Sequence, residues 1–276
     1  MKDEMKFIRP QKKLLQGKIK TYYFHQTDDI FYKNEITYYP NFTSTLNIYK
    51  NATVEWTAHE RTHHYQKGDK PLILLVGKIN KSRKIALFGP QNKITIVFEP
   101  LGLNYFTDIP LSQLIKEHFS FFDYYDIAFN NVISKVFEAT NLEQKRDVLD
   151  DFFSQRFHVF SEKRLTIAIQ HIIETEDNIS ISQLAQNLGI SRRTLLRLFQ
   201  KHLSYSIEEF LSVVKFRKAL ITAQSRSYNL TRVAMEANYY DQSDFIKNFK
   251  SKSGESPKQL LNNLKKIERE LFWKLK

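Results

Sequence analysis

The chain has 276 residues and carries 42 lysines and arginines against 30 aspartates and glutamates, a formal net charge of +12, with no cysteine. The absence of cysteine excludes disulfides, thiolate metal sites and cysteine nucleophiles. Apolar runs such as residues 71–76 are too short to cross a membrane, and the first residues lead into no apolar signal segment. We therefore expect a soluble, cytoplasmic protein of one large domain or two ordinary ones, with no membrane contact.

Most of the excess positive charge lies in the second half of the chain. Residues 1–150 have a net charge of +4, and residues 151–276 have +8. A basic domain of this kind favours a polyanionic partner, most commonly nucleic acid. A basic face that is merely solvated explains the charge equally well.

Two patterns of hydrophobic residues divide the chain and predict an α+β protein. Alternating runs rich in Val, Ile, Thr and Tyr, separated by Gly, Pro and Asn, predict strands that form a β-sandwich or small barrel. The expected strands are 36–39, 45–49, 52–56, 72–79, 84–88 and 93–98. Helical periods follow at 110–118, 123–137 and 142–157, and everything after residue 161 is expected to be helical. The boundary between domains is expected near 157–161.

A helix-turn-helix pattern begins at Ser180. This serine and Gln183 fit a capping box that opens a short helix. Gly189 then stands where a left-handed residue ends the helix, and Ser191 can cap the helix 191–200. That second helix has a buried apolar stripe and an outward basic face, which is the plan of a DNA-reading helix-turn-helix.

The same pattern recurs farther along the chain. Asn229 can cap a short helix, Asn238 takes the place of glycine at the turn, and the following helix is expected over 241–250. Gly189 and Asn238 are 49 positions apart, as are the alanines at 185 and 234. A helix opened by the capping box at Ser206 lies between the two motifs and would set their spacing near one turn of DNA, ~34 Å.

These residues resemble the AraC/XylS family of transcriptional regulators over about 162–261. The motif residues that carry the resemblance are Ala185, Gly189, Ser191, Leu195, Arg197, Phe199, Lys215 to Ala219, Ala234, Asp241 to Ser243, Phe245, Phe249 and Gly254 to Pro257. The sequence departs from the family pattern in three ways: Asn238-Tyr239 replaces the usual Gly-Phe, Ile207 replaces a proline, and Leu196 and Ile246 are apolar where polar readers are common. The apolar pair predicts contacts with thymine methyl groups.

The resemblance implies which residues bind DNA. The expected set is Arg192, Arg193, Leu196 and Arg197 in the first motif, and Gln242, Ser243, Ile246 and Lys247 in the second. Each arginine could instead contact phosphate or stay solvated. Lys201, Lys215, Arg217 and Lys250 are expected to be phosphate or surface charges.

The motif His59-Glu-Arg-Thr-His63 matches the zinc-protease signature H-E-x-x-H. Two histidines at this spacing bind one metal only on a helix, and the motif lies in the strand-rich half, where the histidines would stand about 13 Å apart. A polar loop is therefore expected here, and a non-catalytic metal site that uses His59, His63 or His64 is the alternative. No catalytic residue, metal or cofactor is assigned, and we expect no enzyme.

The resemblance completes the hypothesis for the whole chain. Residues 1–158 are expected to form a regulatory, effector-binding and dimerising domain, a cupin-like barrel followed by helices, and residues 159–276 the DNA-binding domain. The partners are double-stranded DNA, RNA polymerase, a second copy of the chain and an unidentified small-molecule effector, and activation is favoured over repression. The alternatives are an architectural DNA-binding protein without effector and a metalloenzyme that uses His59 and His63. The helix 142–157 is either a dimer helix or one packed on its own barrel.

Overall fold

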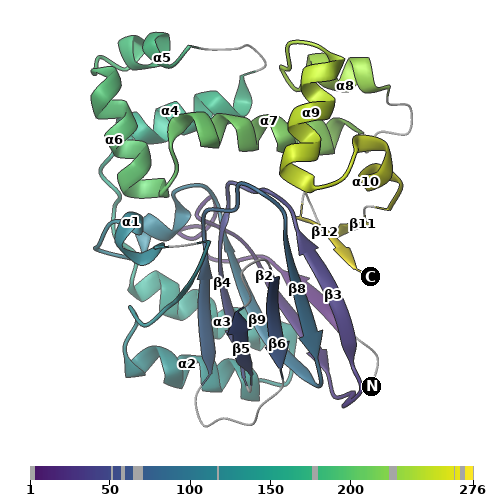
Figure 1. Ribbon diagram of the computed structural model, residues 1–276. Helices are drawn as coiled ribbons and strands as arrows, with labels where there is room; N and C mark the ends of the chain where they lie inside the picture. The colour runs from purple at the N-terminus through teal and green to yellow at the C-terminus, as the bar shows by residue number, and fades with distance from the viewer. Residues whose placement is uncertain are drawn as a thin grey trace. The chain divides into compact units, whose positions relative to one another are not determined.

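The computed structural model describes residues 4–50, 52–56, 60–64, 71–116, 118–175, 180–223, 229–263, 265–267 and 271–275 (Figure 1). It divides the chain into two compact units. The first contains Met1–Asn34, Thr43–Lys78 and Ile85–Ser161. The second contains Glu162–Lys276 together with two short segments from earlier in the chain, Glu35–Phe42 and Ile79–Lys84.

An antiparallel sheet forms the centre of the first unit. Its strands follow the order β1-β2-β9-β4-β7-β10. Their bounds are β1 Glu4–Ile8, β2 Ile19–Thr27, β4 Ser44–Tyr49, β7 Leu72–Val76, β9 Gln91–Phe98 and β10 Phe119–Phe121. On β9, Ile94, Ile96 and Phe98 point to one face and belong to a large apolar core. The alternation arises because successive side chains of a strand point to opposite faces.

Two antiparallel helices, α2 (Ile127–Glu138) and α3 (Leu142–Gln155), contribute the other side of that core. The apolar face of α3 is buried within its own unit through Leu149, Phe152 and Phe153. This packing agrees with one of the two roles expected for the helix, and the dimer role stays a prediction. Two short elements, the 3-10 helix Gly102–Tyr105 and α1 (Leu111–Leu114), precede α2.

A buried carboxylate fixes the N-terminal segment to α3. Asp150 is 1% exposed and accepts hydrogen bonds from the backbone N–H groups of Gln11 (2.8 Å) and Lys12 (3.1 Å). It also accepts one from the hydroxyl of Tyr22 at 2.8 Å. Burial, and then the charge of Asp150, raise the pKa of Tyr22, so this tyrosine stays neutral and keeps donating.

A second sheet has the strand order β11-β12-β3-β8-β6-β5. Its strands are β3 Lys33–Tyr38, β5 Thr53–Trp56, β6 Glu60–His64, β8 Arg83–Phe88, β11 Lys265–Ile267 and β12 Leu271–Leu275. The last strand pairs antiparallel with β3, where Trp273 lies opposite Tyr38. Strands 265–267 and 271–275 correct the expectation that everything after residue 161 is helical. The segment 271–275 begins Leu-Phe-Trp, and such residues favour strands.

The second unit contains the helices α4 Lys163–Glu174, α5 Ile181–Asn187, α6 Arg192–Leu203, α7 Ile207–Ala223, α8 Leu230–Glu236, α9 Gln242–Ser253 and α10 Pro257–Asn263. Together with the β-rich first half, they confirm the predicted α+β class. The helix expected over 110–118 is wrong: only Leu111–Leu114 is helical, and Phe119 already belongs to a strand. The strands β1 and β2 were not expected. No helix among the described residues is long and apolar enough to span a membrane.

The H-E-x-x-H motif does not lie on a helix where the structure describes it. Glu60–His64 form strand β6, paired antiparallel with β5 so that His63 lies opposite Val54. The polar loop expected here is therefore wrong for these residues, because they pair as a regular ladder. His59 lies outside the described residues. The described residues include no cluster of three or more His, Asp or Glu side chains that could hold a metal ion.

Candidate nucleic-acid interface

The first helix-turn-helix consists of α5 and α6, and a serine caps each helix. The hydroxyl of Ser180 accepts a hydrogen bond from the backbone N–H of Gln183, and that of Ser191 accepts one from Thr194, both at 3.1 Å. These bonds satisfy N–H groups that a helix leaves unpaired at its start. The inner faces are buried through Leu184 on α5 and Phe199 on α6. Local sequence thus determines where both helices begin.

A left-handed glycine makes the turn between α5 and α6. Gly189 has a φ of +63°. Its N–H donates to the carbonyl of Gln186 (3.0 Å), and the N–H of Ile190 donates to that of Ala185 (3.1 Å). This pair of bonds closes the C-terminus of α5 in a Schellman motif and turns the chain towards α6.

The second helix-turn-helix consists of α8 and α9 and has the same local geometry. Asn229 accepts a hydrogen bond from the N–H of Arg232 at 2.6 Å, and Asp241 accepts one from Asp244 at 2.7 Å. Asn238 takes the left-handed conformation at the turn, with a φ of +61°. The repeat found in the sequence is therefore a repeat of capped helices and left-handed turns.

The eight predicted DNA-binding side chains lie on the first halves of α6 and α9. Six of them are exposed and two are half-buried; the exposed ones are Arg192, Arg193, Arg197, Gln242, Ser243 and Lys247, and the half-buried ones are Leu196 and Ile246. Each helix thus has an exposed polar stripe with one half-buried apolar residue in it, and Ile246 also packs against the buried cluster that contains Phe245 and Phe249. Such a stripe can donate hydrogen bonds to base edges and phosphates and pack against a methyl group.

Two side chains of the candidate interface already have partners within the protein. Arg192 lies 3.7 Å from the carboxylate of Glu208 on α7, measured from Nη2 to Oε1. The side-chain oxygen of Gln242 accepts a hydrogen bond from the hydroxyl of Thr231 on α8 at 2.9 Å. The oxygen of Gln242 is thus engaged within the protein and its NH2 group remains a possible donor, while the exposed Arg192 pair is weak.

One exposed residue at the same place was not singled out in the sequence. Tyr240 directly precedes the cap of α9 and is 93% exposed. Its backbone N–H donates to the carboxylate of Asp244 at 3.3 Å. Its place directly before the N-terminus of α9, the helix that carries the second set of predicted DNA-binding residues, is a sequence signal by which Tyr240 could have been identified.

Helix α7 connects the two motifs and packs against both. Its capping box is complete: the N–H of Glu209 donates to the hydroxyl of Ser206 (3.1 Å), and the N–H of Ser206 donates to the carboxylate of Glu209 (3.0 Å). Phe210 packs edge-to-face on Phe199 of α6, with ring centroids 5.5 Å apart. Farther along, Phe216 belongs to the buried cluster that contains Phe245 and Phe249 of α9.

The segment Glu35–Phe42 supplies part of the core of this second unit. Tyr39 is buried in the same cluster as Phe216 and Phe249. Its hydroxyl donates to Glu255 at 3.4 Å, and burial, followed by that carboxylate, raises its pKa. The hydroxyl of Tyr205 donates to the carbonyl of Asn41 at 2.9 Å.

The segment Ile79–Lys84 also belongs to the second unit. The side-chain amide of Asn80 donates to the carboxylate of Glu209 at 3.0 Å, at the N-terminus of α7. The N–H of Ser82 donates to the carbonyl of Lys252 at 2.7 Å, near the C-terminus of α9. These bonds attach the segment to the linker helix and to the second recognition helix.

Comparisons with known proteins find similarity in this region. A family model described as a helix-turn-helix domain matches residues 184–263, and one described as a helix-turn-helix Psq domain matches residues 161–206. An uncharacterized HTH-type transcriptional regulator of Haemophilus influenzae is 31% identical over 99 residues, 36% of this chain and 33% of that protein. The Msm operon regulatory protein of Streptococcus mutans is 24% identical over 109 residues, 37% of this chain and 39% of that protein. The chain thus spans between a third and two fifths of the length of these relatives.

Among solved structures, that of ToxT from Vibrio cholerae aligns with 95% of this chain and 97% of its own, at 12% identity and a TM-score of 0.44.

Proposed function

We propose that this chain regulates transcription by binding specific sites on double-stranded DNA, on the premise that its C-terminal part is a helix-turn-helix domain of the AraC type. The observation that carries the proposal is the matched pair of capped recognition helices, each with an exposed polar stripe. A helix of this kind fits the major groove of DNA.

In the proposed mechanism, α6 and α9 enter successive major grooves on one face of the duplex. Arg193 and Arg197 donate to base edges in one groove, and Gln242 and Lys247 do so in the next. Leu196 and Ile246 pack against thymine methyl groups. Two grooves on the same face are about 34 Å apart, and α7 holds the two helices at a fixed separation because both pack on it.

We further propose that residues 1–158 regulate the DNA-binding domain, residues 159–276. The regulatory part would bind an effector or a second copy of the chain. The DNA-bound protein would activate transcription, rather than repress it, through contact with RNA polymerase. A dimer would use a surface other than the apolar face of α3, because that face is buried in its own unit.

The test is the selection of genomic fragments by the full-length protein, followed by footprinting at two salt concentrations. We expect protection over two successive major grooves and a steep loss of affinity with salt, because several cationic side chains displace counterions. A matched chain in which Arg193, Arg197 and Lys247 are replaced by alanine should select no common site. Binding without sequence preference by the unchanged protein would contradict the proposal and favour an architectural role.

A further inference from the structure

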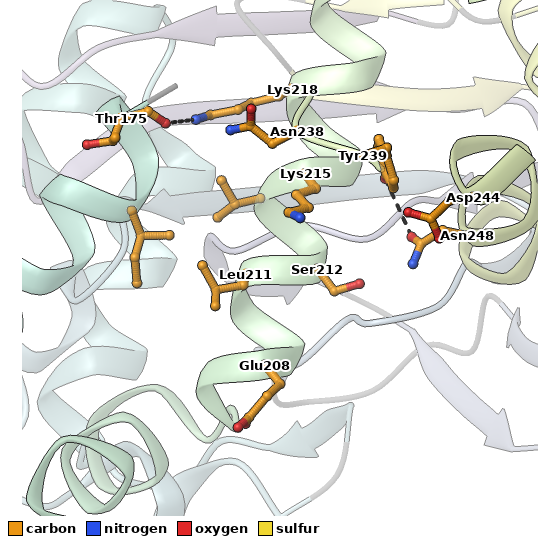
Figure 2. A pocket seen from close by; sticks show the side chains of 12 residues that line it. Thr175, Glu208, Leu211, Ser212, Lys215, Lys218, Asn238, Tyr239, Asp244 and Asn248 are labelled. Atoms are coloured by element: carbon orange, nitrogen blue, oxygen red, sulfur yellow. Dashed lines mark hydrogen bonds between the residues drawn. The ribbon is translucent and has the colours of Figure 1, made fainter. Parts of the chain in front are cut away.

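A cavity of about 300 Å³ lies within the second unit, alongside the linker helix α7 (Figure 2). Helix α7 forms its floor, α4 contributes Ile172 and Thr175, and the turn before α9 and α9 itself contribute Asn238 and Asp244. Ligand pockets range from roughly 300 to 1,000 Å³, so this one suits a small molecule. Its lining combines apolar side chains with two lysines and two carboxylates.

Lys215 is the central cation of the cavity. It is half-buried on α7, and it makes no hydrogen bond or ion pair with another of the residues that the structure describes. Burial lowers the pKa of Lys215, and the negative charge of Asp244 opposes that shift. A half-buried ammonium group of this kind gains more from an anion than one in open water, because its hydration is already incomplete.

Asp244 supplies the opposite charge across the cavity. One of its oxygens accepts the N–H of Tyr240, and no ion pair joins it to Lys215, both of them residues that the structure describes. Near Lys215, the ammonium of Lys218 donates to the carbonyl of Thr175 at 2.6 Å, which orients this second cation at the C-terminus of α4 (Figure 2). The cavity therefore combines two cations of α7 with a carboxylate of α9 and with apolar residues such as Leu211 (Figure 2).

On α9 the cavity is lined by residues other than the predicted base readers. These residues are Asp244 and Asn248, whereas the predicted readers include Ser243 and Lys247. With 3.6 residues per turn, Asp244 and Asn248 each lie about 100° around the helix from the reader that precedes them. On α9, DNA bound to the stripe and a ligand in the cavity would therefore contact different side chains.

We propose that this cavity binds a small zwitterion of the α-amino-acid class. The carboxylate of the ligand accepts hydrogen bonds from the ammonium of Lys215, and its amino group donates to the carboxylate of Asp244. Its side chain lies against Leu211 and Val214 of α7. No bond is made or broken.

The position of the cavity gives its ligand a regulatory consequence, which rests on the proposed function. The ligand would bridge the linker helix and the second recognition helix, since Lys215 and Asp244 belong to α7 and α9. Binding of the ligand would then change the affinity for DNA. The size of the change is set by the difference between the ligand's binding free energies to the DNA-free and the DNA-bound protein.

The experiment measures binding by the full-length chain without DNA, so its result does not depend on the proposed function. Each proteinogenic α-amino acid is tested by ligand-observed NMR and by thermal melting. We expect at least one to bind, and its N-acetyl derivative, which lacks the positive charge, to bind about tenfold more weakly. Lys215→Met should weaken the amino acid about tenfold as well. If no amino acid binds the unchanged protein, the proposal is wrong.

Two further variants identify the site. Asp244→Asn should weaken the free amino acid and remove its advantage over the N-acetyl derivative, while the asparagine can still accept the N–H of Tyr240. Lys250→Met replaces an exposed lysine on α9 outside the cavity lining and should leave binding unchanged. Binding that persists in both Lys215→Met and Asp244→Asn would overturn the assignment. An effect of the ligand on DNA affinity is measured separately.

Discussion

Gly189 and Asn238 hold the same left-handed backbone, with φ values of +63° and +61°, and each ends the first helix of a helix-turn-helix. The hydrogen bonds that follow them match as well: Ile190 donates to Ala185 at 3.1 Å, and Tyr239 donates to Ala234 at 2.9 Å. The two motifs are therefore equivalent at the level of backbone conformation, although one uses glycine and the other asparagine.

Replacement of Gly189 by alanine should measure the free-energy cost of placing a residue with a Cβ atom in the left-handed conformation. A Cβ atom added at Gly189 would meet nothing within 4 Å, so the cost is backbone strain alone. We expect Gly189→Ala to lower the free energy of unfolding by about 1–2 kcal/mol, measured by urea denaturation. Gln186→Ala, at an exposed position of α5, should change it little. Equal stability of the two variants would show that the turn tolerates a side chain.

Arg197 should contribute to the choice of DNA sequence. We expect Arg197→Ala to weaken binding to the selected site by about 1–3 kcal/mol and to relax the preference at one base pair. Lys201→Ala removes an exposed charge on the same helix and should weaken all sites alike without a change of preference. Titrations against a library with single-base changes distinguish the two outcomes. An unchanged preference in Arg197→Ala would make this residue a phosphate contact.

Tyr39 should stabilise the helical second unit even though it comes from the first half of the chain. It is buried beside Phe216 and Phe249, so Tyr39→Ala should cost about 3–5 kcal/mol of unfolding free energy. Phe31→Ala removes a ring that is 84% exposed and should cost little. Hydrogen exchange of the amides of α7 and α9 locates the effect. Unchanged protection of these helices in Tyr39→Ala would mean that the ring does not support them.

His202 should make the stability of the protein depend on pH. Burial, and then the positive charge of Lys201, lower its pKa, while Glu162 acts in the opposite direction. The unfolded chain binds the proton first as the pH falls below about 6.5, so the free energy of unfolding should decrease towards the lower folded pKa. His202→Gln should reduce that slope in urea titrations between neutral and mildly acidic pH. An identical slope in the variant would assign it to other groups.

The features that the sequence predicted well are those determined by a few neighbouring residues. A serine or asparagine at a helix start caps the backbone two or three residues on, so Ser191 and Asn229 could be identified without the fold. A left-handed turn needs glycine or asparagine, so Gly189 and Asn238 could be identified as well. The outward stripes followed from the period of the helices, which the burial of Phe199 and Phe249 confirms.

The features that the sequence did not predict depend on distant residues. Strand β2 is buried on both faces over most of its length, so its sequence lacks the alternation that marks a half-exposed strand. Nothing near Tyr39 indicates that it packs with residues far along the chain. Lys215 and Arg217 were expected to be phosphate or surface charges. Arg217 is instead buried, at 3% exposed, and only the arrangement of α4, α7 and α9 makes Lys215 part of a cavity.

The discontinuous second unit limits how this chain can be divided. A fusion that transferred residues 162–276 to another protein would leave behind Tyr39, the carbonyl of Asn41 that pairs with Tyr205, and the Asn80 amide that pairs with Glu209. The transplanted helices would have a hole in their core and lose partners at the start of α7. A transfer of the recognition helices to another protein should therefore include the segments Glu35–Phe42 and Ile79–Lys84 as well as residues 162–276.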